Sequence, residues 1–311
     1  MSTESNVAPE SPLDSRVRPH APLPLTRLMY WSVRRELWEN RSILVAPLAV
    51  AAVILFGFLV STLQLPKHMR ATLALDPAKQ HAAIQIHYDA AAFLIVLTAF
   101  IVGMFYCLDA LYGERRDRSV LFWKSLPVSD RTTVLSKATI PLVVLPLVIF
   151  PTIVVTQTVM LLLSMAVLLA NGVSTEALWA HVPLFRMSVA LSYGLAAIAL
   201  WHVPIYGWML LVSAWARRVP FLWAVLPPMA ISVFEKIAFG TTHFASLEGY
   251  RLIGWFTQAF IEEAQPHVVM DPLAHLTPGR FLSTAGLWVG LGVGAIFLAM
   301  AVRLRRLREP I

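Results

Sequence analysis

The sequence predicts an all-α integral membrane protein with about six transmembrane helices, and three observations lead to this fold class. Hydrophobic residues make up 58% of the 311 residues and charged residues only 14%, whereas a soluble domain carries roughly 25% charge. The apolar residues gather in six long runs. Lys and Arg concentrate in alternate connections between these runs, which is typical of proteins that keep positive charge on the cytoplasmic side of a membrane.

Each apolar run is long enough to cross a bilayer, because a hydrocarbon core of about 30 Å requires roughly 20 apolar residues in a helix. The runs cover residues 43–65, 90–112, 138–170, 185–216, 219–240 and 281–302. The third and fourth runs exceed 30 residues, so they must tilt, protrude into water or break. Pro141, Pro146 and Pro151 offer break points in the third run and Pro204 in the fourth. The sequence leaves open whether the fourth run forms one span or two.

The distribution of Lys and Arg predicts that both termini are cytoplasmic. In that orientation 18 of the 25 Lys and Arg residues lie inside and six lie outside, with Lys236 within a span. The positive-inside rule favours this arrangement over its reverse. The same rule accounts for the net charge of +7 without a nucleic-acid partner. The expected location is therefore the cytoplasmic (inner) membrane.

The residues before the first run divide into two parts. Residues 1–24 are polar and rich in proline, and we expect a disordered cytoplasmic tail. Residues 25–42 place Met29, Val33 and Leu37 on one face of an amphipathic helix, which suits the inner membrane surface. An ordinary soluble extension is the alternative interpretation of this segment.

A long connection, residues 241–280, separates the fifth and sixth runs. Within it, residues 251–264 read RLIGWFTQAFIEEA, which is amphipathic but too short and too charged to cross the membrane. We expect short helices here that fold back onto the outer leaflet.

The segment 113–137 contains more than a simple loop between two membrane helices needs. It begins with an acid–base pair, Glu114 and Arg115, and ends at Lys137 just before the third run. Between them an L-P-V-S turn ends at Ser129, whose side chain is suited to cap the start of a helix.

Large apolar residues lie in the middle of this segment, at Phe122, Trp123 and Leu126, followed by Pro127. Exposed aromatic residues surrounded by Arg and Lys are typical of protein-binding hot spots. Aromatic residues also anchor loops in the headgroup layer of a membrane. Docking onto a partner protein and contact with lipid are therefore both open from the residues alone.

This segment resembles the cytoplasmic coupling region of permeases from type-2 ATP-binding-cassette (ABC-2 type) transporters. The helix at 25–42 is similar to the elbow helix of that family, and the connection 241–280 is similar to its short outer helices. The resemblance implies that residues 25–311 form one transmembrane permease domain with a cytoplasmic coupling helix in 113–137. It also assigns ATPase coupling to Glu114, Arg115, Phe122, Trp123, Leu126 and Pro127.

The resemblance implies transport, with export as the expected direction, of an unidentified substrate. Its implied partners are a cytoplasmic ABC ATPase subunit and a second permease copy or homologue, within the lipid bilayer. The sequence has no G-x-x-x-x-G-K-[ST] motif to hold ATP phosphates, so we expect no enzyme activity in this chain. Metal-binding motifs are also missing, and no cofactor is expected. The alternatives are a non-transporting membrane partner, such as an immunity or sensor subunit, and an integral membrane enzyme.

Three glycines in the sixth run predict a packing face. Gly286, Gly290 and Gly294 recur at every fourth position, which allows two helix backbones to approach closely. The neighbouring helix belongs either to the same chain or to a partner subunit.

Three polar residues in the fourth and fifth runs are candidates for lining a transport path, because polar groups inside a membrane are costly and often functional. His202 and Tyr206 lie four residues apart on one helix face, and Glu235 lies near the end of the fifth run. The alternatives are hydrogen bonds between helices for the first two, and contact with water at the outer interface for Glu235.

The charge distribution predicts which connections an impermeant thiol reagent reaches in intact cells. A cysteine introduced by Ser119→Cys should be protected, and one introduced by Ala245→Cys should be labelled, because the two positions fall on opposite sides of the membrane. Labelling is measured before and after the cells are opened. Labelling of both positions in intact cells would contradict the topology.

Overall fold

The computed structural model describes residues 25–117, 129–260 and 273–307. Within these residues the chain forms helices and no β-strand, apart from one isolated bridge between Phe260 and Leu276. Six of the described helical segments are long and apolar enough to cross a membrane: Ser42–Ser61, Pro77–Arg116, Asp130–Ala170, Leu184–Trp201, Pro220–Phe239 and Ala285–Leu307. Helix length and composition thus confirm the predicted all-α class and the multi-pass membrane character.

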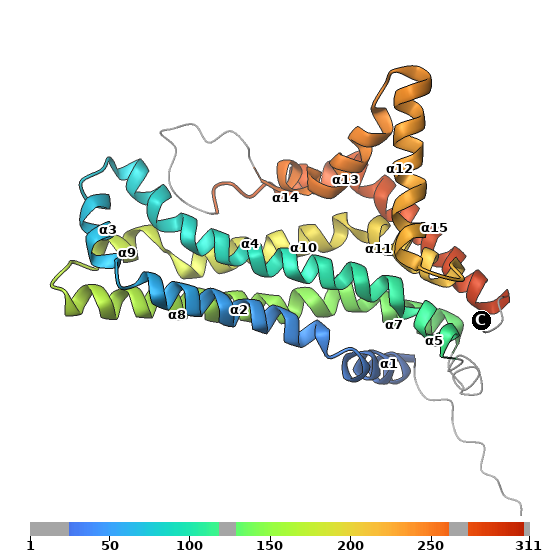
Figure 1. Cartoon of the computed structure of the whole chain (residues 1–311), viewed down its shortest axis with the longest axis horizontal. Coiled ribbons are helices and arrows are strands. Elements are labelled where there is room, and N and C mark those ends of the chain that lie inside the picture. Colours follow the sequence, from blue (N-terminus) through green and yellow to red (C-terminus); the bar gives the residue numbers. More distant parts are fainter. Residues whose placement is uncertain (1–24, 118–128, 261–272, 308–311) are drawn as a thin grey trace, which may run out of the picture.

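Most of these helices lie side by side in an elongated bundle (Figure 1). The helices that follow its length and contact one another are α2 (Ser42–Ser61), α4 (Pro77–Ala110), α8 (Leu145–Ala170) and α10 (Leu184–Trp201). One end, which we call the charged end, is formed by α1 (Leu25–Glu39), α5 (Tyr112–Arg116) and α7 (Asp130–Thr139). The opposite end, which we call the distal end, holds α3 (Leu65–Thr72) and α9 (Glu176–His181).

The helix predicted at 25–42 is present as α1 and ends at Glu39. It packs against α7 at the charged end. Trp31 and Trp38 remain 54% and 70% exposed. The guanidinium of Arg34 lies 5.1 Å from the ring centre of Trp31 and 5.6 Å from that of Trp38. One face of α1 therefore contacts the bundle, and the other presents aromatic rings and positive charge.

The second span is a longer helix than the sequence predicted. Its helical segment covers 40 residues, Pro77–Arg116, with one turn residue, Leu111, between α4 and α5, although the apolar run begins only at residue 90. Pro77 suits the first helical turn, because the N–H that proline lacks has no helical partner there. Residues 77–89 therefore carry α4 toward the distal end, where α3 and α9 contact it.

Of the outcomes left open for the third run, a break at a proline does not occur. α7, the π-helical turn η1 (Ile140–Val144) and α8 form one segment of 41 residues. Pro141 lies in η1, where the hydrogen-bond register already shifts, so its missing N–H falls at an irregular turn. Pro151 lies inside α8 without ending it.

The fourth run is interrupted once, close to the predicted break. α10 ends at Trp201, His202 has non-helical dihedrals (φ −88°, ψ 4°), and α11 (Val203–Trp215) begins with Pro204 in its first turn. α11 then continues along the bundle instead of folding back (Figure 1). The run therefore forms one candidate span followed by a shorter apolar helix.

The fifth span stands away from the bundle (Figure 1). α12 (Pro220–Phe239) crosses the direction of the other helices, and within its described residues only Ala224 is buried. Gly240 ends α12 with a φ of 67°, a left-handed conformation in which glycine has no Cβ to clash. The chain then returns as α13 (His243–Ala259), so the helix predicted from residue 251 begins earlier.

The sixth span, α15 (Ala285–Leu307), packs closely on α11. A Cβ added to Gly294 would lie 2.5 Å from Cγ1 of Val203, and one added to Gly207 would lie 3.1 Å from the Gly294 carbonyl oxygen. The two backbones therefore approach each other at a point where neither helix has room for a side chain.

The other two glycines of this face leave room for side chains of α13. An added Cβ on Gly290 would collide with the Arg251 guanidinium, and one on Gly286 would lie 3.0 Å from the Tyr250 hydroxyl. Gly292, on another side of α15, has no neighbouring atom within 4 Å of such a Cβ. The described contacts of the glycine face thus lie within one chain, with α11 and with α13.

The packing predicts a difference between two glycine substitutions in α15. Gly294→Leu should lower the stability of the fold by about 1–3 kcal/mol or more, because the added side chain forces α11 and α15 apart. Gly292→Leu adds the same side chain where space is open and should change stability little. The measurement is the thermal transition of each purified variant in detergent. Equal transitions for the two variants would show that the close approach does not support the fold.

Candidate functional site

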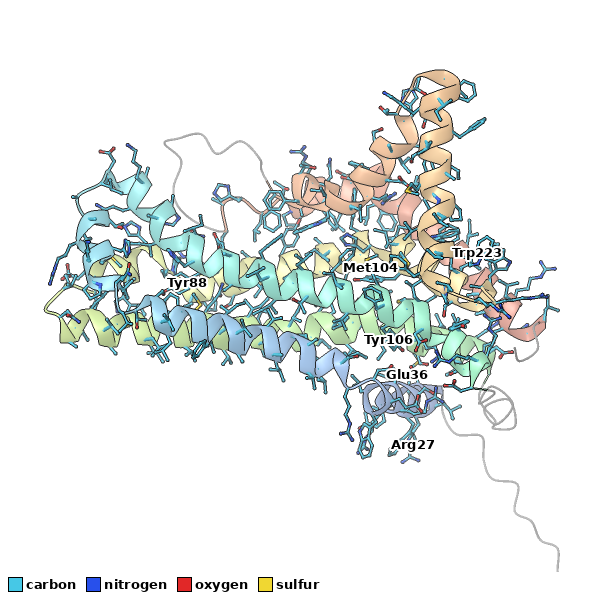
Figure 2. All side chains as sticks on the ribbon, viewed as in Figure 1. Arg27, Glu36, Tyr88, Met104, Tyr106 and Trp223 are labelled. Atoms are coloured by element: carbon cyan, nitrogen blue, oxygen red, sulfur yellow. The ribbon has the colours of Figure 1, made fainter. Side chains whose placement is uncertain are left out.

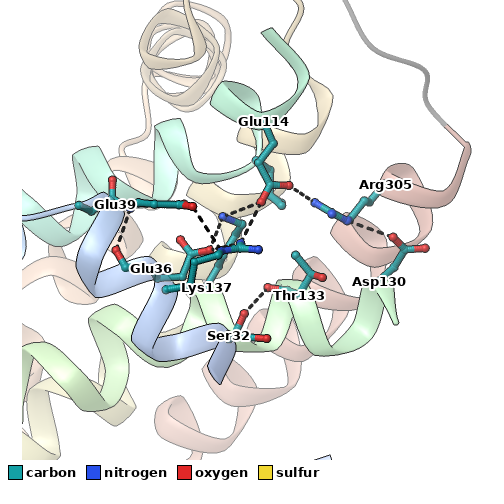
Figure 3. Close-up of polar contacts among 12 residues, drawn as sticks. Ser32, Glu36, Glu39, Glu114, Asp130, Thr133, Lys137 and Arg305 are labelled. Atoms are coloured by element: carbon teal, nitrogen blue, oxygen red, sulfur yellow. Dashed lines mark hydrogen bonds and ion pairs between the residues drawn. The ribbon is translucent and has the colours of Figure 1, made fainter. Parts of the chain in front are cut away.

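A buried ion-pair network lies at the charged end of the bundle, among α1, α5, α7 and α15 (Figure 3). Its central members are Glu36, Glu114, Asp130, Lys137 and Arg305. Arg35 of α1 adds a further cation, with its guanidinium 2.7 Å from the Glu36 carboxylate. Glu39 and Arg306 extend the network through ion pairs with Arg35 and Asp130 at 3.6 and 3.8 Å. Among the described residues the network therefore pairs four carboxylates with four cations from helices that are far apart in the sequence.

Lys137 lies at the centre of the network. Its Nζ is 2.9 Å from Oε1 of Glu36 and 3.1 Å from Oε1 of Glu114, and its side chain is only 3% exposed. The Tyr106 hydroxyl donates a hydrogen bond of 2.7 Å to the other oxygen of Glu36. Burial by itself would raise the pKa of Glu36, but the Lys137 ammonium and the Arg35 guanidinium hold that pKa below its ordinary value. The Glu36 carboxylate is thus kept charged by its neighbours.

Arg305 of α15 connects the two helices that flank residues 118–128. Its Nη1 contacts Oε2 of Glu114 in α5, and its Nε donates to Oδ1 of Asp130 in α7 at 3.0 Å. The Arg305 side chain is only 6% exposed. Hydrogen bonds between charged groups are stronger than neutral ones, especially away from water. One side chain therefore joins both flanks of the segment to the last helix.

Arg115 holds α5 to the end of α11. Its Nη2 donates to the carbonyl oxygens of Ser213 and Ala216, at 2.9 and 2.5 Å. The hydroxyl of Ser213 accepts hydrogen bonds from the backbone N–H groups of Leu111 and Tyr112, at 3.0 and 2.9 Å. The last carbonyls of a helix have no partner within the helix, so Arg115 supplies one. The junction of α4 and α5 is thereby attached to α11.

The predicted coupling residues fall partly on this network. Glu114 and Arg115 are adjacent in sequence, but Glu114 faces Lys137 and Arg305 whereas Arg115 faces α11. Ser129 caps α7 as predicted, with its hydroxyl accepting a hydrogen bond from the Thr132 N–H at 3.1 Å. The remaining predicted coupling residues lie outside the described residues: Phe122, Trp123, Leu126 and Pro127.

His202 and Tyr206, two of the three candidate path-lining residues, lie near each other, with ring centres 6.5 Å apart. The His202 ring nitrogens lie 2.9 Å from the Ile198 carbonyl oxygen and 3.2 Å from that of Leu252, so His202 bridges the α10–α11 break to α13. Burial keeps both side chains inside the bundle.

Glu235 lies apart from this pair, at the turn between α12 and α13. Its carboxylate accepts hydrogen bonds from the Thr241 hydroxyl at 2.6 Å and from the backbone N–H groups of His243 and Phe244, at 2.8 and 2.7 Å. These contacts give the first N–H groups of α13 an acceptor and complement the positive end of the helix. Glu235 therefore fixes the turn at the tip of the α12–α13 hairpin.

Sequence reasoning did not single out Glu36, the most deeply buried acid of the network. Its position held a readable signal, because Glu36 lies between the apolar positions Val33 and Leu37 on the face of α1 that contacts the bundle. A carboxylate on a buried helix face needs a cation nearby. The signal does not identify Lys137 as that cation, since the two residues are 101 positions apart.

Comparison with known proteins gives no relative. No family model, curated protein or solved structure matches the chain. Within the part of the chain that the structure describes, no group of three or more His, Cys, Asp and Glu side chains is placed to hold a metal ion.

The network predicts a large difference between two lysine substitutions. Lys137→Met should destabilise the fold by about 3–5 kcal/mol, because it leaves the buried Glu36 and Glu114 carboxylates without their central cation. Lys79→Met is the matched control: Lys79 is 71% exposed and pairs with Asp76 at 3.4 Å, an arrangement that contributes about 0–1 kcal/mol. Thermal unfolding of the two purified variants measures the difference. Similar transitions would refute a stabilising role for the network.

Proposed function

We propose that this chain is the transmembrane permease subunit of an ABC-2 type transporter, which moves a substrate across the cytoplasmic membrane with energy from a separate ATPase. The observation that carries the proposal is the attachment of both flanks of residues 118–128. Glu114 precedes that segment, Asp130 follows it, and Arg305 contacts both. A coupling element needs such an attachment, since a force on a loosely tethered loop would not reach the membrane helices.

Two long helical segments supply the path for such a force. The segments Pro77–Arg116 and Asp130–Ala170 both start or end at the network and extend toward the distal end. Asp130–Ala170 stays helical throughout, and the turn at Leu111 in Pro77–Arg116 is held by hydrogen bonds to Ser213, so a displacement at the charged end is passed to long helices instead of being lost in a loop. This geometry supports a role in which ATPase motion is passed to the bundle through residues 113–137.

The positions of the chain ends support the proposed orientation. The start of α1, the ends that flank residues 118–128 and the end of α15 all lie at the charged end (Figure 1). Together with the 18 to six division of Lys and Arg, this supports a cytoplasmic charged end. Export, a second permease copy or homologue, and ATP hydrolysis on the partner subunit all belong to the proposal and follow from the family resemblance.

The proposal predicts that Trp123 contributes to ATPase binding. Trp123→Ala should weaken association with the partner ATPase by about 2 kcal/mol or more, because a buried aromatic anchor contributes on that scale at an interface. The measurement is co-purification of a P-loop ATPase from the same cells, at matched membrane levels of wild type and variant.

Trp179→Ala serves as the matched control, since Trp179 is 59% exposed on α9 at the distal end. Its loss should leave ATPase recovery and transport unchanged. Unchanged recovery with Trp123→Ala would overturn the coupling role of residues 113–137. The absence of any co-purifying ATPase with the wild-type chain would instead favour a non-transporting membrane subunit.

A further inference from the structure

A groove with a volume of about 750 Å³ lies between α11, α12 and α13. Its base includes Met104 of α4, near the start of α12 (Figure 2), and Trp208 of α11. Met229 and Val233 of α12 form one wall, and Leu252 of α13 belongs to the other. The volume falls in the range of about 300–1,000 Å³ that small-molecule sites occupy. Its lining is almost entirely apolar, which suits a hydrocarbon chain.

The groove also contains charged side chains with an excess of positive charge. Lys236, Glu248 and Arg251 line it, and Glu248 already accepts a hydrogen bond of 3.0 Å from the Ser232 hydroxyl. Among the described residues, no carboxylate forms an ion pair with Lys236 or Arg251.

Arg251 is held in place by contacts that leave its charge uncompensated. Its Nη2 donates to the Gly286 carbonyl oxygen at 2.5 Å, its guanidinium lies 5.1 Å from the ring centre of Trp201, and its Nη1 is buried without a hydrogen-bond acceptor in the described part of the chain. Burial lowers the pKa of Arg251. Arg251 is partly buried, and a cation with less access to water is stabilised by a nearby anion; among the described residues no carboxylate forms an ion pair with it.

A hydrogen bond between side chains fixes the two helical walls of the groove to each other. The hydrogen bond between Ser232 and Glu248 joins α12 directly to α13 across the groove. An α-helix with its side chains is about 10–12 Å across. A single hydrocarbon chain is much thinner and fits beside such a link.

We propose that this groove binds an amphiphile composed of a hydrocarbon chain and an anionic headgroup, carboxylate or phosphate. The chain lies along the apolar walls, and the headgroup lies near Lys236 and Arg251. The inference goes beyond the permease proposal and does not depend on it, because binding requires neither an ATPase nor transport.

Photolabelling of the purified full-length chain in a non-ionic detergent tests the site. Three diazirine-bearing probes of equal chain length are compared: hexadecanoic acid, a phosphatidylglycerol and hexadecanol. Mass spectrometry of the peptides locates each label. Both anionic probes, or one of them, should label residues 203–252 about fivefold more than the alcohol, the factor expected for an ion pair of about 1 kcal/mol. The probe that labels more strongly identifies the source as a free fatty acid or a phospholipid.

Two pairs of variants locate the site. Lys236→Gln combined with Arg251→Gln should bring the anionic and neutral probes to within about twofold of each other, whereas the exposed pair Lys67→Gln and Arg280→Gln should leave the preference unchanged. Val233→Trp fills the groove and should reduce labelling by all probes about tenfold, on the scale of lost ligand burial. Ile231→Trp is the control, because Ile231 is about as exposed on α12 as Val233 but does not line the groove. This substitution should leave labelling by all three probes unchanged.

Three results would overturn the proposal. The first is equal labelling of residues 203–252 by the acid, the phospholipid and the alcohol, which would indicate ordinary solvation by lipid. The second is labelling that Val233→Trp and Ile231→Trp reduce to the same extent. The third is no labelling in residues 203–252 together with a cross-linked dimer through α12, which would identify a second copy of the chain as the occupant. Val233→Trp leaves Lys236 and Arg251 in place. It therefore still tests whether the probes bind in the groove if the Arg251→Gln variant misfolds.

Discussion

The fold depends on one constraint: the charges buried at the charged end must be neutralised by one another. Removing a carboxylate or an ammonium from water costs several kcal/mol unless a partner compensates, and Lys137 is 3% exposed beside a Glu36 that is 1% exposed. α1, α5, α7 and α15 must therefore meet with the geometry that the ion pairs require. Apolar packing elsewhere tolerates small shifts between helices, whereas a displaced ion pair leaves an uncompensated charge. The network thus specifies how the amphipathic α1 and the last span are placed against the rest of the bundle.

Much of the architecture could be predicted from the sequence because it depends on local properties. The length of an apolar run predicts a span, and the bounds of α12 agree closely with the fifth run at 219–240. The break in the fourth run lies just before Pro204, because proline has no N–H to continue the helical hydrogen bonds. The lengths of α4 and of the proline-containing third span could not be predicted in this way. Residues 77–89 are polar and give no membrane signal, and a π-helical turn accommodates Pro141. Glu36 pairs with Lys137, and Arg305 bridges Glu114 and Asp130, across 101 or more residues. Composition and periodicity describe only local segments, so they do not predict these pairs.

The small residues of α15 have two structural consequences. At Gly294 they bring α15 against the backbone of α11, and at Gly286 and Gly290 they admit side chains from α13. The second contact draws Arg251 inward against α15, while α12, whose only buried residue within Pro220–Phe239 is Ala224, stays apart. The groove between α12 and α13 is therefore a result of the same glycine pattern that holds the sixth span in place. The glycine pattern of α15 thus accounts both for the close packing against α11 and for the open space between α12 and α13.

The length of α4 relates the protein to the thickness of its membrane. Its 34 residues extend about 51 Å at about 1.5 Å per residue, while a hydrocarbon core is only about 30 Å thick. The apolar part, residues 90–112, matches the core, so the first turns of α4 project into water together with α3 and α9. Glu114 and its partner Arg305 lie just beyond the end of that apolar part. Arg34 and Trp38, on the side of α1 that faces away from the bundle, place a cation and an exposed aromatic ring at the same end of α4 as these buried charges.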